Sequence, residues 1–172
     1  VKEAEIKVTK GGATLMAETA DIDASSAKLT AKDELTLTAQ QSITATEASV
    51  EAASLAMTAE TGSVEASRLT ATVADQASVE AGDAGGLNKA DLTAGALTAT
   101  ATSGDLSVKA AEINATKGGV TLTAKAVDID ASGVNLTAVG PAKLTAGQNL
   151  KLTPSGDAVA SVTAKSLSAT AG

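Results

Sequence analysis

The stretch Asp21–Ala66, DIDASSAKLTAKDELTLTAQQSITATEASVEAASLAMTAETGSVEA, carries the repeat that decides the fold. A large apolar residue returns about every seven positions, a polar residue follows it, and an alanine follows the polar residue. The apolar anchors are Ile22, Leu29, Ile43, Val50, Met57 and Val64, and the alanines are Ala24, Ala31, Ala45, Ala52, Ala59 and Ala66. The repeating unit is therefore large apolar, polar, alanine.

This unit fits a strand better than a coiled-coil heptad. A coiled coil needs a second apolar stripe three or four residues after the first, and those positions hold mostly polar residues such as Lys32, Glu47 and Arg68. Alternation by two instead places side chains on opposite faces of a strand. The inward row continues two residues before the anchors, at Ala20, Ala27, Ala48, Leu55 and Gly62, with Gln41 as the exception.

A short strand with one large apolar side chain cannot bury itself, so many such units in sequence indicate a wound, stacked architecture. We predict an all-β parallel β-solenoid (β-helix) with about three short strands per coil of about 21 residues. Successive coils would stack at ~4.8 Å.

An internal duplication supports this coil length. Residues 4–31 return 107 positions later as residues 111–138, with 18 of 28 residues identical. Five coils in 107 residues give about 21 residues per coil, about eight coils in the chain and a rod ~40 Å long. We therefore treat residues 1–172 as a single, internally duplicated β-solenoid domain.

The repeat is interrupted near residues 82–90, at Gly82-Asp83-Ala84-Gly85-Gly86-Leu87-Asn88-Lys89. Three explanations are open: a protruding loop, a fold-back, or a joint between the duplicated halves. A loop or irregular coil is the favoured expectation.

The composition limits the classes of function. The chain has a net charge of −7 and contains no Cys, His, Phe, Trp or Tyr. Aromatic side chains usually fill a domain core, so their absence agrees with a narrow interior lined by aliphatic residues. The apolar fraction of 44% argues against disorder. No apolar run reaches the ~20 residues of a membrane span, and an acidic chain offers little to nucleic acid phosphates.

We expect no enzyme activity and assign no catalytic, cofactor-binding or metal-binding residues. Without His or Cys the usual general base, thiol nucleophile and soft metal ligands are missing. The pairs Asp21/Asp23 and Asp128/Asp130 resemble Ca²⁺ ligands, but a solvated charged face is the favoured interpretation. No signal peptide is visible, and the first residue, Val1, suggests a processed form or a fragment.

Outward threonines raise ice binding as a further alternative. With coils of about 21 residues, one face stacks Asp23, Thr44 and Glu65, and another stacks Thr30, Glu51 and Thr72. Glutamates interrupt both ladders, so ice binding ranks third among the candidate functions.

Segments 32–39 (KDELTLTA), 103–110 (SGDLSVKA) and 146–153 (AGQNLKLT) look like the repeats of filamentous-haemagglutinin-type exoproteins. Those are secreted bacterial right-handed β-helices that act as shafts for adhesion or toxin delivery. This chain departs from them by lacking aromatics and Asn ladders. The apolar-x-small repeat also resembles the spike shafts of contractile injection systems (valine-glycine-repeat proteins), in which three chains intertwine.

The first resemblance implies a non-catalytic structural segment of a rigid extracellular shaft or filament, of a bacterial surface or adhesin type. The second implies an intertwined trimeric spike shaft. No capping helix is visible at either end, so the terminal coils would expose strand edges, which either neighbouring chain segments or other copies of the protein would cover. We expect self-association, either by end-to-end stacking or as a trimer. A host or cell-surface ligand is the other candidate partner.

Overall fold

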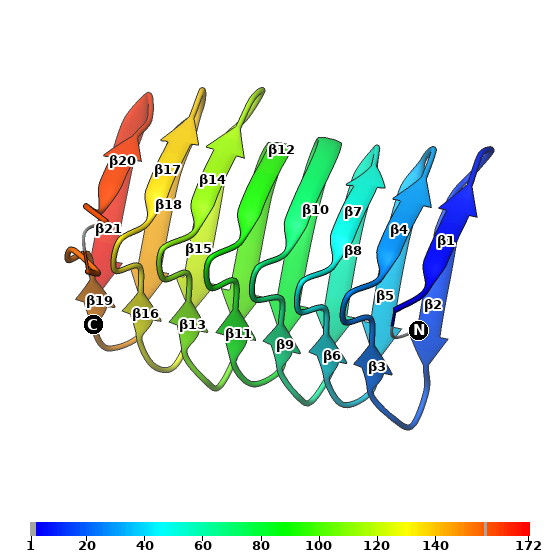
Figure 1. The fold of residues 1–172 in the computed structure, drawn as a ribbon. Helices are drawn as coiled ribbons and strands as arrows, with labels where there is room; N and C mark the ends of the chain where they lie inside the picture. Colours follow the sequence, from blue (N-terminus) through cyan, green and yellow to red (C-terminus); the bar gives the residue numbers. More distant parts are fainter. Residues whose placement is uncertain (1–2, 157) are drawn as a thin grey trace.

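The alternation of inward aliphatic and outward polar residues winds the chain into a parallel β-solenoid of about eight coils, each of roughly 22 residues (Figure 1). The computed structural model describes residues 3–156 and 158–172, and no helix occurs in those ranges. The predicted fold class is confirmed. Each complete coil contributes one strand or strand segment to each of three faces.

The strands of the short face have two residues each: β3 (Ile22–Asp23), β6 (Ile43–Thr44), β9 (Val64–Glu65), β11 (Gly85–Gly86), β13 (Leu106–Ser107), β16 (Ile129–Asp130) and β19 (Leu150–Lys151). The mixed face comprises β1 (Glu5–Val8), β4 (Lys28–Ala31), β7 (Ser49–Ala52), residues 70–73 of β10 (Thr70–Ala81), residues 91–94 of β12 (Asp91–Ala101), β14 (Glu112–Ala115), β17 (Asn135–Ala138) and β20 (Ser161–Thr163). The threonine face comprises β2 (Ala13–Ala17), β5 (Glu34–Ala39), β8 (Ser54–Ala59), residues 77–81 of β10, residues 97–101 of β12, β15 (Val120–Ala124), β18 (Pro141–Ala146) and β21 (Ser166–Ala171).

The faces form two parallel sheets. The short face is a seven-stranded sheet in the order β19-β16-β13-β11-β9-β6-β3. The other two faces join into one 14-stranded sheet, because β10 and β12 run through the bend between them. Figure 1 shows the strands stacked in chain order, with the two ends of the chain at opposite ends of the stack. Paired residues are 20 apart at Leu35–Leu55 and 26 apart at Asn135–Ser161, so the corners absorb variation in coil length.

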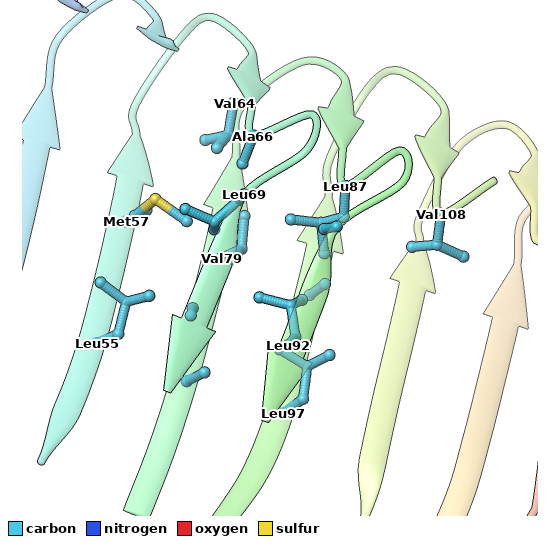
Figure 2. Close-up of a cluster of buried hydrophobic side chains, with 14 of the residues drawn as sticks. Leu55, Met57, Val64, Ala66, Leu69, Val79, Leu87, Leu92, Leu97 and Val108 are labelled. Carbon is cyan, nitrogen blue, oxygen red and sulfur yellow. The ribbon is translucent and has the colours of Figure 1, made fainter. Parts of the chain in front are cut away.

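The interior is a continuous column of aliphatic side chains. The anchors and alanines of Asp21–Ala66 are buried, with Ile22 the most exposed at 7%. Figure 2 shows Leu55, Met57, Leu69 and Val79 among the apolar side chains of this interior. Burying one such side chain contributes ~1.5–3 kcal/mol. Ala20, expected in the inward row, is instead exposed because it lies in the corner between β2 and β3.

Each coil turns at an equivalent corner with a left-handed backbone. The residues with positive φ at these corners are Glu3, Ser26, Glu47, Arg68, Lys89, Ala110, Gly133 and Gly156. At the six corners from Ser26 to Gly133, a backbone hydrogen bond closes the turn. At Ser26, for example, Ala27 N–H donates to the Ala24 carbonyl at 3.2 Å. This recurring turn joins the short face to the mixed face.

The expected loop near residues 82–90 requires a correction. Gly85 and Gly86 form β11, which pairs in register with β9 and β13. Gly85 occupies the position of an apolar anchor, and a Cβ there would lie 2.8 Å from Leu106 Cδ1, so the Leu106 side chain fills the space. Leu87 is fully buried. The stretch is a regular coil in which a neighbouring leucine replaces the missing anchor.

The duplicated blocks have matching strand bounds. β1, β2, β3 and β4 recur 107 residues later as β14, β15, β16 and β17. The offset equals five steps along the sheet order β1-β4-β7-β10-β12-β14.

The core is open at both ends of the stack. Leu167 faces inward in register with Ala142 but is 51% exposed, because no further coil covers β21. At the other end, Ile6 and Leu15 are only partly buried.

Candidate functional site

The two acidic pairs singled out in the sequence lie at the short face, where their carboxylates bind backbone groups. Asp21 Oδ1 accepts a hydrogen bond from Ser42 N–H at 2.7 Å. Asp23 Oδ1 accepts one from Ser25 N–H at 2.9 Å. In the second pair, Asp128 Oδ1 accepts hydrogen bonds from both N–H and Nδ2 of Asn149. Across the described part of the chain, no three acidic side chains gather where they could hold a metal ion.

The contacts of Asp21 and Asp128 belong to a polar ladder that directly precedes the short-face strands. A side-chain oxygen of one coil accepts the backbone N–H of the next, as Ser42 Oγ does from Ser63 and Asp105 Oδ1 does from Asp128. The ladder resembles an Asn ladder in its effect, but here mainly Asp and Ser supply it. The sequence signal was a polar residue directly before a two-residue apolar-polar strand.

Asp130 is the centre of the most connected charge cluster. Lys109 Nζ lies 3.1 Å and Lys151 Nζ 3.8 Å from Asp130 Oδ2, one lysine from each adjacent coil. Ser132 donates to Asp130 Oδ1 through both its N–H and its hydroxyl. Partial burial acts to raise the pKa of Asp130, but the hydrogen bonds from Ser132 and Lys109 outweigh it and the pKa falls below its usual value. The cluster therefore ties three coils together.

The pKa of Glu65 is shifted in the opposite direction to that of Asp130. It stands outward on β9 in register with Gly86, and a Cβ on Gly86 would lie 2.5 Å from Glu65 Oε2. Burial raises the pKa of Glu65, although the backbone hydrogen bond from Ser67 partly opposes this. The carboxylate thus occupies the space that Gly86 leaves open.

The bend between the mixed and threonine faces holds a shallow groove and an ion pair. A groove of about 510 Å³ crosses four coils and is lined among others by Lys7, Thr30, Glu51 and Thr72. Further along the bend, Lys117 Nζ lies 2.8 Å from Asp75 Oδ1, a pair separated by 42 residues, or two coils.

The threonine face carries two straight outward rows. One row is Thr14, Thr36, Ala56, Ser78, Thr98, Thr121, Lys143 and Ser168, and the other is Met16, Thr38, Thr58, Glu80, Thr100, Thr123, Thr145 and Thr170. Ten of these sixteen positions are threonine and two are charged, so the face is nearly neutral. The sequence prediction missed these rows, although the repeated Thr-apolar-Thr pattern at 36–38 and 121–123 could have revealed them.

The ladders that the sequence did predict are present elsewhere. Asp23, Thr44 and Glu65 stack on the short face. Thr30, Glu51 and Thr72 stack on the mixed face. Glutamates interrupt both, as expected.

No family model matches this chain, and neither a curated protein nor a solved structure matches it. In the described part of the chain, no helix has the length and apolar character needed to cross a membrane.

Proposed function

We propose that this chain is a non-catalytic structural element, a segment of a rigid extracellular shaft or filament of a bacterial surface protein. The observation that carries the proposal is the unbroken column of buried aliphatic side chains from Ile22 to Ala146. Parallel ladders link every coil to the next, and the polar ladder adds side-chain links at several coils, such as that between Asp128 and Asn149. In such repeat architectures each unit contacts only its neighbours, so length is extended by adding coils.

The two ends have matching surfaces for such extension. In the last internal pair, Ala142 faces Leu167 and Leu144 faces Ala169. If β21 paired with β2 of a second copy in the corresponding register, Ala13 would face Leu167 and Leu15 would face Ala169. This arrangement repeats the internal alternation of small and large side chains. We therefore propose end-to-end self-association through these matching strand edges.

The tandem fusion of two copies tests the shaft proposal. Ala171 of one copy is joined to Glu5 of the next through residues 40–48, which connect β5 to β7 by way of the short-face strand β6. We expect a single straight rod of doubled length by small-angle X-ray scattering, with a higher unfolding midpoint than one copy. Two hinged bodies with the midpoint of a single copy would contradict the proposal. A control fusion through a flexible Gly/Ser linker of the same length gives the hinged behaviour for comparison.

The intertwined trimer is separated from this proposal by molecular mass in solution. One chain supplies all three faces of every complete coil and encloses its own core, which favours the single-chain solenoid. We expect a monomer at low concentration and end-to-end oligomers at high concentration. A compact trimer that never dissociates would support the spike-shaft alternative.

The proposed location and ligand rest on the resemblance to secreted shafts. Antibody labelling of intact source cells tests the location, and we expect labelling without permeabilisation. Binding of the purified rod to host or neighbouring cells tests for a cell-surface ligand.

A further inference from the structure

The threonine face has a regular two-dimensional geometry. Its strand pairs from β2 to β21 keep their register, and the only shift between β10 and β12 lies between Val73 and Gln76, in the bend. Outward side chains therefore repeat at ~4.8 Å between coils and at ~6.8 Å between the two rows of one strand. Thr98, Thr100, Thr121 and Thr123 form a complete block of this lattice.

Most hydroxyls of this lattice are not used in hydrogen bonds to the protein. Across residues 3–156 and 158–172, none of the threonines 36, 38, 58, 100, 121 and 123 uses its side-chain hydroxyl in a hydrogen bond to the protein. Thr98 Oγ1 accepts one hydrogen bond, from Gln76 Nε2 at 3.2 Å. The buried Thr145 Oγ1 has no protein partner. At the corners, by contrast, hydroxyls such as those of Thr61 and Ser103 are bound to backbone carbonyls.

The threonines are also held in place before any ligand arrives. Those at positions 36, 38, 58, 98, 100, 121, 123 and 145 are half-buried between their neighbours, and a β-branched side chain has few χ1 rotamers. A rigid array loses little side-chain entropy on binding, which strengthens association.

The face suits an uncharged, periodic ligand. Within the two rows only Glu80 and Lys143 are charged, and they stand three coils apart. The groove of about 510 Å³ is lined by residues of the bend and the mixed face, so it does not interrupt the two rows. Threonine side chains with two fixed repeats offer matching positions to a water lattice. The prism faces of hexagonal ice repeat at comparable distances in two directions.

We propose that the threonine face binds ice. Each hydroxyl contributes one modest hydrogen bond to water, and the methyl groups pack against the ordered layer. The strength of binding comes from many such positions acting together along the coils. Ice binding goes beyond the shaft proposal and is independent of it, because a rod without ice activity keeps its proposed structural role.

The test compares two substitutions on the same strand. Thr100→Lys alters the threonine face and Thr93→Lys alters the mixed face, and both residues are half-buried outward positions of β12. Thermal hysteresis, ice-crystal shaping and inhibition of recrystallisation are measured on the purified chain. We expect the native chain to shape ice, Thr100→Lys to lose at least fivefold in hysteresis, and Thr93→Lys to stay within twofold.

A gain-of-function pair keeps the test decisive if Thr100→Lys fails to fold. Glu80→Thr completes the row between Thr58 and Thr100, whereas Glu51→Thr makes the same change on the mixed face. We expect hysteresis to rise with Glu80→Thr and to stay unchanged with Glu51→Thr. A native chain that leaves ice crystals round, or equal responses of the two faces in both pairs, would overturn the proposal.

Discussion

The mixed face and the threonine face are built on the same core, and two of their strands are shared, yet their outer surfaces differ. The outward positions of the mixed face are Glu5, Lys7, Lys28, Thr30, Ser49, Glu51, Thr70, Thr72, Asp91, Thr93, Glu112, Asn114, Asn135, Thr137, Ser161 and Thr163. Six of these sixteen are charged, against two of sixteen on the threonine face. The inward rows of both faces are aliphatic.

The difference shows that the fold constrains the inward rows and leaves the outward rows open to function. Threonine suits any exposed strand position, so strand propensity alone would enrich both faces equally. Charges keep a protein soluble, and here they gather on one of two otherwise equivalent faces. Two outward rows with only two charges along eight coils are therefore better explained by what this face contacts.

The largest expected effect tests whether the two faces share one core. Leu92 lies beneath the mixed face and Leu97 beneath the threonine face, both on β12 and both buried. We expect Leu92→Asp and Leu97→Asp each to lower the unfolding free energy by ~2–7 kcal/mol, because each buries a carboxyl group that has no hydrogen-bond partner. Chemical denaturation followed by circular dichroism measures both. Thr93→Asp and Thr98→Asp are the matched outward controls, and losses as large as those at the leucines would contradict the assignment of faces.

The next effect concerns the bend that separates the faces. A Cβ on Gly95 would lie 2.3 Å from the Asp75 carbonyl oxygen, so Gly95→Ala forces the backbone to shift. We expect the unfolding free energy to fall by ~1–3 kcal/mol, as for other overpacked sites.

Gly11 occupies the turn between β1 and β2 and has open space around it, but its φ is +81°. Gly11→Ala should cost ~1–2 kcal/mol from the left-handed backbone alone, and unlike Gly95→Ala it should leave the pairing of β10 with β12 intact by amide hydrogen exchange.

Two carboxylates of the short face, Asp130 and Glu65, have pKa values shifted in opposite directions. The lowered pKa of Asp130 means that its stabilising effect is complete above the unfolded value, ~3.9, and disappears as pH falls through the folded pKa. The raised pKa of Glu65 means that its charged form destabilises the fold near neutral pH, and that this cost disappears as pH falls.

We therefore expect Asp130→Asn to lower stability at pH 7, with the difference from the native chain shrinking below about pH 4. Glu65→Gln should raise stability at pH 7, with the difference shrinking as Glu65 becomes protonated. Denaturant midpoints measured from pH 7 to pH 3 check both. Effects of the same sign at pH 7 would contradict the assigned electrostatics.

The smallest effect is that of the ion pair across the bend. Lys117 and Asp75 are both more than half exposed, and exposed pairs typically contribute ~0.2–1 kcal/mol. Lys117→Ala should lower stability by no more than this, and the loss should vanish in high salt because exposed charges are screened. A loss that persists in molar salt would show that the lysine acts through packing.

The inward repeat was predictable from the sequence. Each unit contributes one large apolar anchor and one alanine, and this spacing within the unit stays the same when the corners differ in length. The threonine rows were missed because the phase slips by one at Leu35-Thr36-Leu37-Thr38-Ala39, so extrapolation from Ile22 and Leu29 followed the other two faces. The coil at Gly85-Gly86 was missed because its core is completed by Leu106 from the next coil. The left-handed corners gave little signal, since Ser26, Glu47, Arg68 and others adopt them without glycine.

The most direct test of the account is a set of distances along the threonine face. The chain has no cysteine, so Thr14 can be changed to Cys and spin-labelled together with a second Cys at Thr98, Thr121 or Lys143. These positions lie four, five and six coils from Thr14 in one outward row. Electron–electron resonance should give narrow distances of ~19, ~24 and ~29 Å, a constant increment of ~4.8 Å per coil. Broad distributions, or distances that do not increase by equal steps, would contradict a straight wound rod with a regular outer lattice.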